Sequence, residues 1–239
     1  MARSVVLLSG GLDSTVNLAR ASSETEVALV LYFDYGHKAA QREIAAFRKI
    51  ISHYKVKSRV ISLPWLETLT QSAICNPRKQ VPLPDTYASI DIADKDNRFS
   101  KYTIDTWVPN RLAMMLNIAA SYADSLECDY IILGLNNTRG VTNPEHSLPF
   151  YTALNNLLEN STLNIPQVVS YTGPMTKTQI FEHGMELNAP LDLVWDCING
   201  ESKMCSKCES CMRFIRAVVD SGHEQWFSNL NRIKSLADS

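Results

Sequence analysis

The chain has 239 residues, 45% of them apolar, which is typical of a globular protein with a sizeable core and excludes a disordered chain. A formal net charge of −2 excludes the strongly basic surface that favours nucleic acids or anionic membranes. No apolar run approaches the ~20 residues of a membrane span, and the N-terminal run 5–8 is too short for a signal peptide. We therefore expect a cytoplasmic protein that binds neither membranes nor nucleic acids directly.

Apolar runs predict five strands, in chain order 5–8, 27–33, 60–63, 130–135 and 168–171. Helical periodicity separates several of them, over 15–21, 41–54 and 110–123, and a Thr-Lys-Thr-Gln capping box at 176–179 starts a further helix. Continuously apolar strands that alternate with helices favour the α/β class, with a doubly wound parallel sheet covered on both faces.

The first predicted strand leads into the loop Ser9-Gly10-Gly11-Leu12-Asp13-Ser14, which a helix follows directly. Two glycines tolerate positive φ and expose backbone N–H groups, while the positive end of the helix faces any anion bound there. No Gly-Lys-Ser/Thr follows, so the loop is not a Walker loop. The sequence therefore predicts a phosphate-binding turn of another kind.

Two more positions follow predicted strands, Asp34 after the second and Gly134 after the fourth. Ligands of such sheets bind beyond the carboxyl ends of the strands, so we expect both residues beside Ser9 in one crevice. Residues 64–105 break the alternating pattern with several prolines and a polar stretch. We expect part of that segment to form a lid over the crevice, with a disordered insertion as the alternative.

Four cysteines gather near the end of the chain, at Cys197, Cys205, Cys208 and Cys211. Four thiolates at this spacing suit a closed tetrahedral zinc site that contributes to folding; an iron–sulfur cluster and unrelated buried thiols are the alternatives. We therefore expect two parts, a nucleotide-binding domain at 1–190 and a small helical zinc-binding appendage at 191–239.

The loop resembles the Ser-Gly-Gly-x-Asp-Ser signature of the ATP pyrophosphatase (PP-loop) superfamily. The tail Trp195-Asp196-Cys197-Ile198-Asn199-Gly200 is similar to the Trp-Ser-Cys-Tyr-Asn-Gly that usually precedes the zinc cysteines of the 7-cyano-7-deazaguanine synthase family. Phe33-Asp34-Tyr35-Gly36 and Val108-Pro109-Asn110-Arg111 extend the resemblance, which spans nearly the whole chain. The chain is thereby identified as a member of that family, with a sheet of the HUP/PP-loop type.

The resemblance implies an ATP-dependent carbon–nitrogen ligase. Such an enzyme adenylates the carboxylate of 7-carboxy-7-deazaguanine, releases pyrophosphate and lets a nitrogen nucleophile attack. The implied cofactors are structural Zn²⁺ and ATP with Mg²⁺, and the implied partners are a small 7-deazapurine acid and a second copy in a homodimer.

The resemblance also implies the site residues. Asp13 is expected to hold Mg²⁺, Ser14 to donate its hydroxyl and Arg111 to meet a phosphate, an ordinary surface arginine being the alternative for Arg111. The expected ATP-binding residues are Leu8, Ser9, Gly10, Gly11, Leu12, Asp13, Ser14, Thr15, Asp34, Tyr35 and Gly134.

The chain departs from the family where the deazaguanine is held. Family members usually read Asp-Tyr-Ser-Gly-Tyr-Pro-Asp-Cys-Arg, whereas Arg139, Asn143 and Ser147 here replace the first acid, an aromatic and the arginine. Pro144 and an acid, Glu145, persist. We expect a more open pocket wall that admits an amine larger than ammonia, and poor conversion of the adenylate to the free nitrile.

Two smaller departures accompany these. Asn110 stands for the glycine of the family's Pro-Gly-Arg-Asn, and His37 for the glutamine of its Gly-Gln-Arg-His. Such changes suggest a divergent relative, similar to those in bacterial antiviral gene clusters. The alternatives are therefore transfer of the adenylate to a protein or nucleic-acid amine in a defence system, and a nucleotide-binding partner without catalysis.

Overall fold

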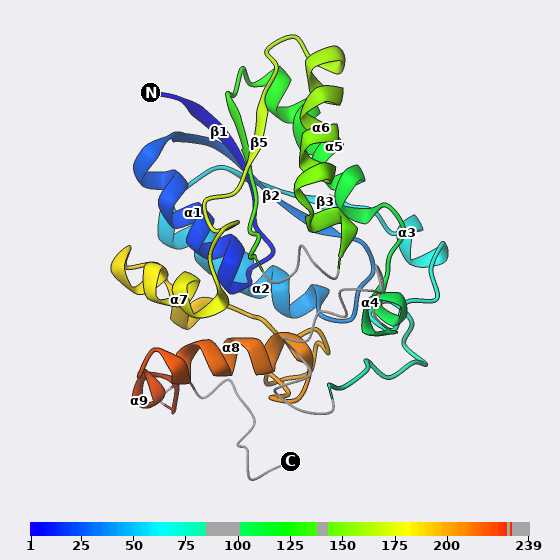
Figure 1. The fold of residues 1–239 in the computed structure, drawn as a ribbon, viewed down its shortest axis with the longest axis vertical. Helices are drawn as coiled ribbons and strands as arrows, with labels where there is room; N and C mark the ends of the chain where they lie inside the picture. Colours follow the sequence, from blue (N-terminus) through cyan, green and yellow to red (C-terminus); the bar gives the residue numbers. More distant parts are fainter. Residues whose placement is uncertain (85–100, 138–142, 229, 231–239) are drawn as a thin grey trace.

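A five-stranded sheet forms the centre of the chain, whose computed structural model describes residues 1–84, 101–137, 143–228 and 230 (Figure 1). All strands are parallel, in the order β3-β2-β1-β4-β5. Their bounds are β1 (Arg3–Leu7), β2 (Glu26–Asp34), β3 (Ser58–Ser62), β4 (Tyr130–Ile132) and β5 (Gln167–Val169). The five predicted strands are thus confirmed, and the strand order reverses between β1 and β4, where ligands of such sheets bind.

Four predicted helices are also confirmed, as α1 (Leu12–Glu24), α2 (Ala40–Tyr54), α5 (Arg111–Ser125) and α7 (Lys177–Glu186). The capping box at the start of α7 is present, with Thr176 and Gln179 each bonded to the other's backbone. Two further helices, α8 (Glu209–Asp220) and α9 (Glu224–Ser228), lie in the C-terminal segment that was expected to be helical, although their bounds were not predicted. Not predicted were α3 (Trp65–Thr68), α4 (Lys101–Thr106), α6 (Leu148–Ser161) and the 3-10 turns η3 (Pro144–His146) and η4 (Leu191–Leu193).

The sheet is doubly wound, because alternate residues of its strands enter two different cores. Val5 and Leu7 of β1 pack into a cluster with Leu116 of α5 and Leu158 of α6. The intervening Val6 packs with α1 and α2 on the opposite face. In Figure 1, α5 and α6 accordingly lie on one side of the sheet and α1 and α2 on the other. The predicted fold class is confirmed.

The C-terminal part packs on the sheet domain through a third core. Phe214 of α8 lies in one cluster with Phe181 of α7 and with Leu12 and Val16 of α1. The division at 190/191 stays a prediction, and this shared core leads us to propose that both parts unfold together. No helix in the described ranges is long and apolar enough to cross a membrane.

Candidate active site

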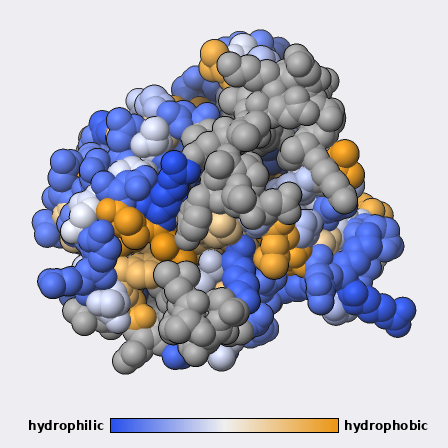
Figure 2. Space-filling model, turned by 60° about the horizontal axis from the view of Figure 1, so that its bottom comes forward, coloured by the Kyte–Doolittle hydropathy of each residue, from blue (hydrophilic) through white to orange (hydrophobic). Residues whose placement is uncertain are grey.

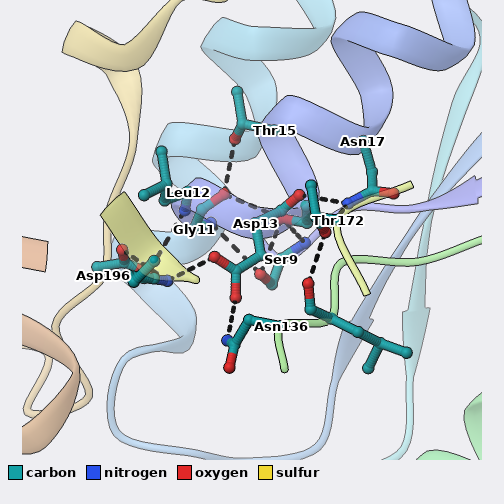
Figure 3. Close-up of polar contacts among 12 residues, drawn as sticks. Ser9, Gly11, Leu12, Asp13, Thr15, Asn17, Asn136, Thr172 and Asp196 are labelled. Carbon is teal, nitrogen blue, oxygen red and sulfur yellow. Dashed lines mark hydrogen bonds and ion pairs between the residues drawn. The ribbon is translucent and has the colours of Figure 1, made fainter. Parts of the chain in front are cut away.

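The loop between β1 and α1 has the shape that its glycines predict. Gly10 has φ +85°, and a Cβ atom there would lie 3.1 Å from the Ala46 Cβ. The Ser9 hydroxyl accepts the Gly11 N–H at 3.3 Å and lies 3.1 Å from the Ser14 hydroxyl. The two hydroxyls therefore border a turn that ends at the N-terminus of α1 (Figure 3).

Gly134 lies against this loop at the end of β4. A Cβ atom on it would lie 2.4 Å from the Ser14 backbone nitrogen and 2.6 Å from the Asp13 carbonyl carbon. No side chain fits such a close approach of two backbones. The loop and the end of β4 therefore form one surface, as their positions after neighbouring strands predict.

Asp13 is held by two residues that the sequence analysis missed. Its Oδ2 accepts the Asn136 side-chain N–H at 2.7 Å, and its Oδ1 lies 2.7 Å from Lys177 Nζ (Figure 3). Lys177 Nζ also lies 3.5 Å from Asp196 Oδ2. Lys177 was visible in sequence only as part of a capping box, and no spacing rule connects it with the loop.

A cleft of about 720 Å³ opens beside the loop, at the carboxyl ends of the strands. Figure 2 looks onto the face that is lowest in Figure 1, where hydrophobic residues gather beside hydrophilic ones. Seven of the predicted site residues line the cleft: Leu8, Ser9, Gly11, Ser14, Tyr35, Arg111 and Gly134.

Other predicted site residues have structural contacts and do not belong to the cleft's lining. Thr15 donates its hydroxyl to the Gly11 carbonyl at 2.8 Å, which stabilises the first turn of α1. Asp34 accepts the Gly36 N–H at 3.1 Å and so fixes the turn after β2. Gly10, Leu12 and Asp13 likewise contribute to the loop without lining the cleft.

The segment that is predicted to form a lid contributes to the wall of the cleft. Pro82, Leu83 and Pro84 line it, as do Tyr102 and Thr106 of α4. Residues 85–100 between them lie outside the described ranges. The lid therefore stays a prediction. The described residues on both sides of this gap in the sequence line the cleft.

Arg111 lines the same cleft as the loop, at the first position of α5. It donates from Nη1 to the Tyr35 hydroxyl at 2.8 Å. Burial raises the pKa of Tyr35, and the nearby Arg111 charge opposes that rise, so the phenol stays a neutral partner. Arg111 is thus a cation on the cleft wall and not an isolated surface arginine.

Glu145 binds the start of the same helix. Its Oε1 accepts the Leu112 N–H at 3.2 Å, and Asn110 at the N-cap has φ +56°. Asn110 therefore adopts a left-handed backbone conformation, which favours glycine and which asparagine tolerates better than most other residues. Burial raises the pKa of Glu145, opposed by the Arg111 charge and by hydrogen bonds from the Leu112 and Ala113 N–H groups.

The three replaced pocket residues have different places. Asn143 lines the cleft and accepts the Glu145 N–H at 3.0 Å. Ser147 instead caps α6, accepting the Phe150 N–H at 3.4 Å, and does not belong to the cleft's lining. Arg139 lies outside the described residues. Among the described residues, therefore, Asn143 alone supports the expectation of a more open pocket wall.

The four C-terminal cysteines come together as predicted. All are buried, and their Sγ atoms lie within 4.8 Å of one another, with Cys205 and Cys211 at 3.9 Å. A zinc–sulfur distance of about 2.3 Å separates the sulfurs of a tetrahedral site by about 3.8 Å, so the group fits such an ion. Backbone N–H groups donate to Cys197 Sγ and Cys205 Sγ at 3.4 and 3.3 Å. Side-chain hydrogen bonding with the other three thiols lowers the pKa of Cys205.

Comparisons with known proteins identify the relatives of this chain. A family model described as queuosine biosynthesis protein QueC matches residues 3–221. The 7-cyano-7-deazaguanine synthase of Pelotomaculum thermopropionicum is 43% identical over 220 residues, which cover 92% of this chain and 98% of that protein. The 7-cyano-7-deazaguanine synthase of Desulforamulus reducens is 42% identical over 219 residues, covering 92% and 94%.

Among solved structures, the U34-tRNA thiolase NcsA from Methanococcus maripaludis aligns over 98% of this chain and 73% of its own. That alignment has a TM-score of 0.48 and 12% identity. The family model and the two synthases instead match nearly the full length of the chain at much higher similarity. The chain therefore belongs to the QueC family of ATP-dependent enzymes.

Proposed function

We propose that the protein adenylates the carboxylate of a 7-deazaguanine-type acid such as 7-carboxy-7-deazaguanine and passes the acyl group to a nitrogen nucleophile. One observation carries this proposal: a single cleft joins the phosphate-binding turn at Ser9 and Ser14 to a wall of Arg111, Asn143 and Glu145. A carboxylate oxygen attacks the α-phosphorus of ATP, pyrophosphate leaves, and the amine then displaces AMP. The relatives named as synthases support this reaction.

The loop residues would hold the diphosphate of ATP. The Ser9 and Ser14 hydroxyls and the N–H groups at the start of α1 provide neutral donors, and Lys177 a positive charge. Asp13 would hold Mg²⁺, and the ammonium group 2.7 Å from its Oδ1 supports a cation at that position. When bound, Mg²⁺ neutralises phosphate charge.

The wall that contains Arg111, Asn143 and Glu145 would hold the acid. Arg111 offers a guanidinium to a phosphate or carboxylate, and the nearby Tyr35 hydroxyl fixes its orientation. Glu145 faces the same cleft and offers an acceptor for the N–H groups of a guanine-like ring. Holding both reactants in one cleft supplies the proximity that adenylation needs.

We propose that the four cysteines hold structural zinc. Four buried thiolates form a closed site that leaves no position for a reacting group, and the site contributes to folding. Cys197 directly follows Asp196, which contacts the loop, so the metal would also fix the tail against the nucleotide site.

The reaction is tested by incubating the protein with 7-carboxy-7-deazaguanine, ATP, Mg²⁺ and ammonium, and following products by mass spectrometry. We expect pyrophosphate and the adenylate, with poor conversion to the nitrile, since Asn143 replaces an aromatic side chain on the wall. Efficient conversion to 7-cyano-7-deazaguanine, at two ATP per nitrile, would contradict the altered-wall argument. Absence of pyrophosphate with this acid would contradict the substrate.

The assembly of the protein and its acceptor stay predictions. The homodimer rests on the resemblance to the family alone. An acceptor protein and a role in antiviral defence rest on the sequence departures alone. Added protein amines in the same mass-spectrometric assay test the acceptor.

A further inference from the structure

Asp196 brings a second carboxylate onto the phosphate loop. Its Oδ1 accepts the Leu12 N–H at 3.4 Å, and a Cβ atom added to Gly11 would lie 2.7 Å from the same oxygen (Figure 3). N–H groups at the start of a helix are the donors that bound phosphates use. The carboxylate therefore competes for a donor that an anionic ligand of this loop needs.

The backbone on both sides of Asp196 is tied to its surroundings. The Trp195 N–H donates to the Gly10 carbonyl at 2.8 Å, and the Trp195 indole N–H donates to the Cys197 carbonyl at 2.8 Å. Cys197 in turn belongs to the buried thiol cluster. Because these contacts hold the backbone, the carboxylate would leave the loop by rotation of the Asp196 side chain.

One ammonium group serves two carboxylates here. Lys177 Nζ lies 2.7 Å from Asp13 Oδ1 and 3.5 Å from Asp196 Oδ2. The three side chains are 11% to 15% exposed, so solvent and salt screen their charges weakly. Within this group of three, the carboxylates outnumber the ammonium group by one, beside a turn that is built to receive an anion.

Among the described residues that line the cleft, negative side chains also outnumber positive ones. The two arginines of this lining donate hydrogen bonds, Arg111 to the Tyr35 hydroxyl at 2.8 Å and Arg213 to Glu209 at 2.9 Å. Besides Asp196, the carboxylates that line the cleft are Glu43, Asp105, Glu145 and Glu209. A polyphosphate that brings its full charge into this cleft meets more negative than positive groups along the described wall.

We propose that Asp196 makes the loop selective for metal-bound polyphosphate. It repels free ATP or pyrophosphate, and the repulsion weakens when a bound divalent cation offsets two of the phosphate charges. The inference rests on the proposed function, in which this loop holds the diphosphate of ATP. Asp196 is then a specificity-determining residue that acts through charge, at a position where the family's tail usually has an uncharged serine.

The test is isothermal titration calorimetry of the full chain with pyrophosphate, in excess Mg²⁺ and in buffer freed of Mg²⁺ by a chelating resin. Asp196→Asn removes the charge and keeps an acceptor for the Leu12 N–H, and Asp196→Ser is a second variant without charge. Both should bind metal-free pyrophosphate about tenfold more tightly than wild type, with less than about a threefold change for the magnesium complex.

Asp192→Asn is the matched control, because this exposed carboxylate lies in η4, shortly before Asp196 in the chain, and its loss changes the net charge equally. The control should keep the wild-type preference for the magnesium complex. If wild type binds pyrophosphate tightly and both Asp196 variants keep its preference for the magnesium complex, the proposed selectivity is contradicted but the proposed function is not. Weaker binding of only the magnesium complex would make Asp196 a metal ligand and overturn the proposal. No wild-type binding in either buffer would contradict the proposed function as well.

Discussion

Replacing Asp13 by asparagine should lower acid-dependent pyrophosphate release at least about a hundredfold while leaving the fold intact. The variant loses the anionic ligand proposed for Mg²⁺ and the 2.7 Å ion pair with Lys177. The asparagine side chain has nearly the same shape and still offers an oxygen to Asn136, and Lys177 keeps Asp196 within 3.5 Å. Pyrophosphate release in saturating ATP and Mg²⁺ measures the loss, and thermal unfolding checks the fold.

The matched control for that variant is Asp220→Asn, which removes an exposed carboxylate on α8, away from the loop. It should release pyrophosphate at the wild-type rate. Equal turnover of Asp13→Asn and wild type would refute the role of Asp13 in the loop.

Replacing Cys208 by serine should lower the midpoint of thermal unfolding by about 10 °C or more, with loss of the bound metal. The four Sγ atoms lie within 4.8 Å of one another in the core that α1, α7 and α8 share, so loss of the ion loosens that core. Elemental analysis of the wild-type protein should find one zinc per chain.

Cys128→Ser is the control, because Cys128 is also fully buried but lies in the other core, against α5. That variant should keep its metal. A wild-type protein without metal would contradict the zinc site, and a visible absorption band from iron would assign it to an iron–sulfur cluster instead.

The strands and the parallel, doubly wound type of the sheet could be predicted because their signals are local, whereas the strand order comes from the structure. Each strand is a short apolar run, and α2, α5 and α7 each show either helical periodicity or a capping box. α6 had such signals as well, with Ser147 as its cap and Pro149 in its first turn. They were missed because Ser147 was interpreted as a pocket position by comparison with the family's motif.

The contacts around Asp13 could not be predicted, because they join residues far apart in sequence. Asn136 and Lys177 are 123 and 164 residues away along the chain, and no periodicity connects them with the loop. Asp196 stood within a recognised tail motif, yet its contact with the Leu12 N–H depends on tertiary structure, in which the neighbouring Trp195 N–H donates to the Gly10 carbonyl. Motif spacing predicts which local turn forms, and tertiary packing decides which charges meet there.

Transfer of ¹⁸O from the acid to AMP tests the central claim most directly. The acid carries ¹⁸O in both carboxylate oxygens. If one of these oxygens attacks the α-phosphorus, it stays on phosphorus when the amine attacks the acyl carbon, so the AMP that leaves contains one ¹⁸O. We predict labelled AMP and unlabelled pyrophosphate by mass spectrometry. Formation of ADP with ¹⁸O in inorganic phosphate, or AMP without label, would contradict the account.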